Sequence, residues 1–229
     1  MLEKVVNYIR KKRRWRRFAP RLHEFSTLDQ FKAFLGHTGC APYLTVHWMN
    51  LSAHNRAEAE DVLARYALDV RGRRVLDIGA GYGDFLDVCR ERGAVTVGTD
   101  YDPFVVRWLQ LRGHLAFLCN ILRSFGPLDG NSFDIVHLKE SIVVEYFHLL
   151  GMNRLHGFLA NVDRLCAPGA RVIIRPYFEI SGPDRRRKVE DPLNCPFTHT
   201  MLAAGYKIMD PLPGREDDPV CPVTYGKTA

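Results

Sequence analysis

Short apolar runs alternate with stretches of helical periodicity over most of the chain. Apolar residues recur at helical spacing over 84–92, 103–113 and 152–166. Apolar runs typical of buried strands lie between these stretches, at 74–78, 95–100, 114–119, 133–138 and 171–174. Strands that alternate with helices predict a parallel sheet with helices on both faces. A short helix at 197–204 and two last strands, at 206–209 and 222–225, predict a closing hairpin that adds an antiparallel strand.

The first 56 residues lack this alternation, although short helices are predicted at 27–35 and from residue 56 onward. We therefore divide the chain into three parts. They are a basic amphipathic leader at 1–25, an N-terminal helical or lid segment at 26–56, and an α/β domain at 57–229.

The charge of the chain is concentrated in the leader. The 229 residues carry a net charge of +6, yet residues 1–25 alone hold nine basic and two acidic residues. The remaining residues hold 23 basic and 24 acidic ones, so the domain is nearly neutral. Such a leader is able to bind an anionic membrane surface or RNA, or to pack Trp15 and Phe18 on its own domain.

Composition excludes several classes of protein. Hydrophobic residues make up 46% and charged residues 25%, which is typical of a globular chain. No apolar run has the length of a membrane-spanning helix, and no apolar signal-peptide core follows the basic start. The six cysteines form no Cys-x-x-Cys pair and no zinc-like spacing with histidine. We therefore expect a cytoplasmic protein, able to lie at a membrane surface through its leader, with reduced cysteines and no metal.

The strongest chemical motif is the glycine-rich turn at 79–83, which follows a strand that contains Asp77. Glycine lets the backbone turn sharply and lets a ligand approach closely. Asp100 ends the next strand, where a carboxylate can accept hydrogen bonds from both hydroxyls of a ribose. Asp84 replaces the last glycine of the dinucleotide fingerprint, and a carboxylate there would repel a pyrophosphate. The motif therefore predicts a nucleoside ligand without phosphates.

These motifs resemble those of the class I S-adenosylmethionine-dependent methyltransferases. Residues 74–83 are similar to the family's first motif, 133–136 to its fourth strand, and 167–170 to its Pro-Gly-Gly turn, with Ala170 in place of the second glycine. The resemblance covers about residues 57–226. It implies a Rossmann-like, seven-stranded, mostly parallel sheet with helices on both faces. It also implies S-adenosyl-L-methionine as cofactor and S-adenosyl-L-homocysteine as product.

The resemblance also implies positions for the cofactor. Asp77 would interact with its amino group, Asp100 would hold the ribose, and Tyr101 would pack on the adenine. Asn120 stands where the family often has an aspartate that faces the adenine amino group. The full set of implied cofactor residues is Asp77, Gly79, Ala80, Gly81, Asp100, Tyr101, Asn120, Ile121 and Lys139.

Methyl transfer to a hydroxyl requires a group that removes its proton. We consider His47, His54 and Glu140 as candidates for this base, whereas His137 lies inside a strand and is interpreted as structural. Trp48 is a candidate substrate contact, and Arg175, at the end of a strand, is a candidate for binding an anionic substrate.

The sequence leaves three hypotheses about the function and the methyl acceptor. The first is a methyltransferase that acts on a small molecule or glycan at oxygen. The second is an RNA methyltransferase tethered by its basic leader, and the third is a non-catalytic domain that binds the cofactor. Residues 139–142 read Lys-Glu-Ser-Ile, which lacks the Asn/Asp-Pro-Pro-aromatic motif of amino-directed nucleic-acid enzymes.

Overall fold

The computed structural model describes residues 13, 16–39, 41, 44, 52–120, 126–128, 130, 132–143, 151–177, 195–211 and 223–228. At 140–143, 177, 210–211 and 223 it describes the backbone alone.

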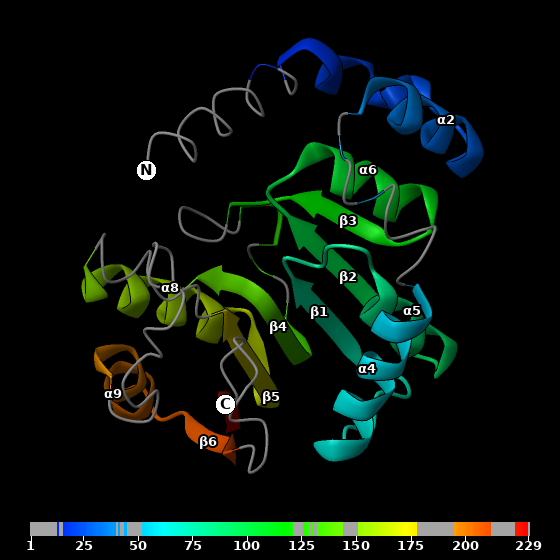
Figure 1. Cartoon of the computed structure of the whole chain (residues 1–229). Helices are drawn as coiled ribbons and strands as arrows, with labels where there is room; N and C mark the ends of the chain where they lie inside the picture. Colours follow the sequence, from blue (N-terminus) through cyan, green and yellow to red (C-terminus); the bar gives the residue numbers. More distant parts are fainter. Residues whose placement is uncertain are drawn as a thin grey trace.

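A seven-stranded sheet forms the centre of the molecule (Figure 1). Its strands, in the order in which they pair, are β3 (Leu115–Leu118), β2 (Val95–Asp100), β1 (Arg74–Ile78), β4 (Phe133–Val143), β5 (Cys166–Tyr177), β7 (Val223–Thr228) and β6 (Lys207–Pro211). Only β7 runs antiparallel to its neighbours β5 and β6. The predicted mostly parallel sheet with one antiparallel strand in its last hairpin is confirmed.

Helices cover both faces of this sheet (Figure 1). The described α-helices are α2 (Leu28–Thr38), α4 (Ser52–Arg65), α5 (Asp84–Glu91), α6 (Pro103–Leu111), α8 (Met152–Arg164) and α9 (Pro196–Ala203), with 3₁₀ helices η1 (Ala19–Glu24) and η3 (Gly126–Leu128). None of the helices in these described segments is long and apolar enough to cross a bilayer.

Strands β4 and β5 are longer than predicted, because they pair with each other well beyond their apolar centres. Their register runs from Phe133 beside Cys166 to Val143 beside Tyr177, with irregularities near both ends. The extension carries Lys139 and Arg175 to adjacent positions near the carboxyl ends of the two strands. Pairing of this kind depends on the neighbouring strand and leaves no periodic pattern in either segment.

The alternation of side chains along β1 separates two cores. Leu76 and Ile78 pack with α8 and α9 on one face, whereas Val75 packs with α4 and α5 on the other. Asp77 therefore shares the α4 and α5 face of the sheet with Val75, because side chains two residues apart point the same way.

The N-terminal region packs on α6. Leu22 and the α2 residues Phe31 and Leu35 are buried in one cluster with α6. The Phe25 and Phe34 rings lie 4.7 Å apart between centroids, and Phe25 also lies 5.5 Å from Phe31. The end of the predicted leader and the described beginning of the 26–56 segment thus share the core of the domain.

Candidate functional site

The glycine-rich turn connects the end of β1 to the start of α5. Gly81 has a φ of 50°, and a Cβ placed on it would meet only the carbonyl oxygen of Gly79, 3.9 Å away. The backbone at Gly81 is thus open to a ligand. Gly83, with a φ of 85°, has a different reason to lack a side chain, because its Cβ would lie 2.5 Å from Cδ2 of Leu109. One glycine allows close approach of a ligand, and the other allows α6 to pack on the turn.

The carboxylate of Asp100 lies beside this turn because β1 and β2 are parallel neighbours. Its Oδ2 accepts a hydrogen bond from the backbone N–H of Gly81 at 3.3 Å, and its Oδ1 accepts one from Asp102 at 2.8 Å. Each oxygen of a carboxylate is able to accept more than one hydrogen bond, which is the property that binding of ribose hydroxyls requires. The geometry suits an acid that both shapes the turn and binds a ribose.

Side chains from α6 and the segment after it support the turn from outside. The carbonyl oxygen of Tyr82 accepts hydrogen bonds from Nε1 of Trp108, at 3.0 Å, and from Arg112. Asp87 of α5 pairs with Arg112 and with Nε2 of His114, the latter at 2.9 Å. Burial raises the pKa of Asp87, but the hydrogen bond with His114 and the charge of Arg112 outweigh burial and hold that pKa below its ordinary value.

A cavity of about 280 Å³ lies against the glycine turn, between the turn, α4 and β4. Predicted cofactor residues in its wall are Asp77, Gly79, Ala80, Gly81 and Lys139. Residues that were not predicted to bind the cofactor also line it, and they are Asn55, Glu58, Ala59, Val62, Tyr82, Gly83, Asp84, Phe85 and His137.

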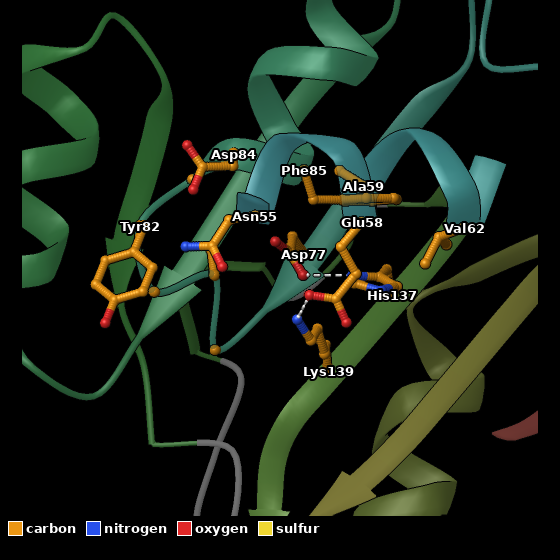
Figure 2. Close-up of a pocket in the computed structure, with 14 residues that line it drawn as sticks. Asn55, Glu58, Ala59, Val62, Asp77, Tyr82, Asp84, Phe85, His137 and Lys139 are labelled. Atoms are coloured by element: carbon orange, nitrogen blue, oxygen red, sulfur yellow. Dashed lines mark hydrogen bonds and ion pairs between the residues drawn. The ribbon is translucent and has the colours of Figure 1, made fainter. Parts of the chain in front are cut away.

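Asp77 and His137 form a buried pair in the wall of this cavity. They are register partners on β1 and β4, and each is 4% exposed. Nδ1 of His137 lies 2.9 Å from Oδ1 of Asp77, and the imidazole stacks on Phe85 with 3.9 Å between ring centroids. Figure 2 shows this pair among the side chains that line the cavity. His137 is therefore a structural partner of Asp77 and also faces the site.

Glu58 of α4 joins the two strand ends, and the sequence did not single it out. Its Oε1 accepts a hydrogen bond from Nη1 of Arg175 at 2.7 Å, and its Oε2 pairs with Nζ of Lys139 (Figure 2). Burial raises the pKa of Glu58, but the hydrogen bond and charge of Lys139, together with Arg175, outweigh burial and hold the pKa below its ordinary value. An acid within a charged helix predicts a solvated position, so no local signal revealed this contact.

The other predicted residues lie elsewhere. Tyr101 is 55% exposed and Asn120 is exposed, and neither is among the described residues that line the cavity. His54 is exposed at the start of α4 and likewise does not line it. Four predicted side chains, those of His47, Trp48, Ile121 and Glu140, lie outside what the structure describes. Among the described residues, no three His, Cys, Asp or Glu side chains form a group that could hold a metal ion.

Comparison with known proteins identifies the family. The sequence model of a methyltransferase domain family matches residues 51–197, which is more than half of the chain. The chain belongs to this methyltransferase family. The prediction of a class I S-adenosylmethionine-dependent methyltransferase is confirmed, and with it the cofactor. The open backbone at Gly81 and the Asp100 carboxylate beside the turn fit that cofactor.

Solved structures of methyltransferases share the fold. A TehB-like S-adenosylmethionine-dependent methyltransferase from Corynebacterium glutamicum has 19% identity and a TM-score of 0.51, over 78% of this chain and 92% of that one. DesVI from Streptomyces venezuelae has 16% identity and a TM-score of 0.52, over 75% and 90%. At these identities the likeness concerns the fold.

Proposed function

We propose that this methyltransferase transfers a methyl group from S-adenosylmethionine to an oxygen of a small molecule or glycan. The observation that carries the proposal is the cavity of about 280 Å³, which joins the glycine turn to ionisable side chains on β1 and β4. Its volume is just below the usual range of ligand pockets, about 300 to 1,000 Å³, and the cavity places these ionisable side chains beside the turn where the cofactor is expected.

The Asp77–His137 pair supports transfer to oxygen. The bound cofactor supplies an activated methyl group, so the protein must position the acceptor and remove its proton. The Asp77 carboxylate accepts a hydrogen bond from Nδ1 of His137, which leaves Nε2 as the basic nitrogen of the ring. We assign this role to His137 because it lines the cavity, whereas the predicted base His54 is exposed and does not line it. The predicted bases His47 and Glu140 lie outside the described side chains.

A methyl-transfer assay with labelled S-adenosylmethionine tests this function. The acceptors are matched pairs of hydroxyl and amino sugars, together with total RNA. We expect label on the hydroxyl acceptor, and a loss of at least 100-fold in kcat for His137→Gln, because general-base catalysis contributes about 10² to 10⁴. His156→Gln, a change at an exposed position of α8, is the control and should retain activity. Label only on amino sugars would overturn the assignment to oxygen.

The basic N-terminal segment supports the second candidate, an RNA methyltransferase with a tether, and equally an anionic membrane surface as partner. Arg13, Arg16 and Arg17 are exposed in the structure, whereas Arg21 pairs with Glu24 at 3.0 Å. Changing the first three to glutamine should weaken RNA or vesicle binding at low salt, since each cation near an anionic membrane contributes about 1 kcal/mol. Arg21→Gln is the matched control, because Glu24 already offsets that charge.

Two results decide between these partners. Methylated RNA that disappears with the triple change would establish the second candidate in place of the first. Binding to vesicles of anionic lipid without RNA binding would assign the segment to a membrane surface. Binding to neither at low salt would show that the segment serves only the packing of Phe18 and Leu22.

A further inference from the structure

Two cations lie side by side near the cavity, with one acid between them. Lys139 and Arg175 are register partners near the carboxyl ends of β4 and β5, which is the edge of an open α/β sheet where ligands bind. Glu58 places one carboxylate oxygen on each of them. The three side chains retain between 21% and 29% of their exposure, so solvent and ligands have access to the group.

The balance of charge in this group favours an anionic ligand. Two cations and one carboxylate leave a net charge of +1 within this group. When bound, the cofactor would add the positive charge of its sulfonium. An anion that approached Lys139 and Arg175 would therefore be attracted by both side chains and by the methyl donor.

The contacts of Glu58 show what kind of anion the two cations accept. Each carboxylate oxygen takes one cation, which is a geometry that suits a planar group with two oxygens. Other residues of α4 also hold this helix in position. Ala59 and Leu63 are buried in the core, and Arg56 pairs with Glu91 of α5. The Glu58 side chain is thus able to rotate away while the helix stays in place.

We infer that Lys139 and Arg175 recognise a carboxylate on the methyl acceptor, and that Glu58 occupies its position until the acceptor binds. This inference rests on the proposed function and names the class of acceptor. Glu58, Lys139 and the glycine turn line one cavity, so a carboxylate held by the two cations would place the rest of the acceptor near the bound cofactor. Glu58 thus competes with the acceptor's carboxylate for the two cations. The enzyme accordingly favours acidic acceptors over neutral ones.

Titration calorimetry on the full chain tests the inference, with and without saturating S-adenosylhomocysteine. The probes are D-glucuronate, its neutral counterpart D-glucose, and glucose 6-phosphate. Glu58→Gln should bind glucuronate at least fivefold more tightly than the wild type and should bind glucose no better. The added change Arg175→Gln should remove that gain. Asp163→Asn is the matched control, because it also removes a carboxylate paired with a lysine, Lys227, 2.9 Å away.

Each outcome decides one part of the inference. No gain in Glu58→Gln, or an equal gain in Asp163→Asn, overturns the site and leaves Glu58 as a structural contact of α4. If Glu58→Gln gains affinity only for glucose 6-phosphate, Lys139 and Arg175 recognise a phosphate and not a carboxylate. Glu58→Asp has a shorter acid, and its gain in affinity for glucuronate should be smaller than that of Glu58→Gln. If circular dichroism shows that Glu58→Gln does not fold, Glu58→Asp is the variant to measure. Failure of the wild type to bind S-adenosylhomocysteine would count against the proposed function and not against this site.

Discussion

Replacing Asp100 with alanine should weaken the binding of S-adenosylhomocysteine by about 30-fold. The Asp100 carboxylate accepts hydrogen bonds from the N–H groups of Gly81 and Asp102, and each carboxylate oxygen is able to accept more than one. We expect the two hydroxyls of the ribose to donate to the same carboxylate. Hydrogen bonds to a charged group are the stronger kind, so their loss should cost about 2 kcal/mol or more of binding free energy. By the usual relation, 2 kcal/mol corresponds to a factor of about 30 in the dissociation constant.

The same change removes the hydrogen bonds that Asp100 accepts from Gly81 in the turn, at 3.3 Å, and from Asp102 after β2, at 2.8 Å. At about 1 kcal/mol each, they predict a decrease of about 2 kcal/mol in the free energy of unfolding. Denaturant titration measures this decrease, and calorimetry with S-adenosylhomocysteine should be carried out where the variant is folded.

Asp102→Ala provides the control for a local effect on the turn. The Asp102 carboxylate caps α6 by accepting a hydrogen bond from Phe104 N at 3.0 Å, and its loss should cost about 1 kcal/mol of stability. It should leave the affinity for S-adenosylhomocysteine within about twofold. Unchanged affinity in folded Asp100→Ala would refute the ribose assignment. An equal loss in Asp102→Ala would show that Asp100 acts only through the shape of the turn.

Three further predictions concern the turn, the N-terminal packing and the buried ion pairs. Gly81→Val should abolish binding of S-adenosylhomocysteine in calorimetry, because the side chain would enter the open side of the turn and strain a φ of 50°. Normal binding by this variant would show that the cofactor does not lie against the turn. Phe31→Ala should lower the free energy of unfolding by about 3 to 5 kcal/mol, since this fully buried ring packs in the cluster between α2 and α6. A decrease below about 1 kcal/mol in denaturant titration would show that α2 is not part of the domain core. Asp87→Asn should be less stable than the wild type at pH 7. Because the folded-state pKa of Asp87 is lowered, this difference should diminish as the pH falls below about 4, and urea titrations at pH 7 and pH 3 that show equal differences would contradict that pKa.

Local patterns in the sequence determined the fold class and the cofactor motif. The alternation of strands and helices is a property of residues within about ten positions of one another, and each predicted strand from 74–78 to 133–138 is present. The glycine turn and Asp100 likewise lie within one strand–helix–strand unit, so their spacing alone indicates a ligand at that edge of the sheet.

Only the tertiary structure decided what surrounds the cofactor motif. Glu58 meets Lys139 across 81 residues and Arg175 across 117, and Asp77 meets His137 across 60. These contacts arise from the order and register of the strands and from the position of α4 above them. Helical and strand periodicity specify which face of an element is buried, but they do not specify which residue of a distant element it meets. For this reason the sequence predicted a cofactor site at the glycine turn, and the folded chain revealed which charged side chains lie around that turn.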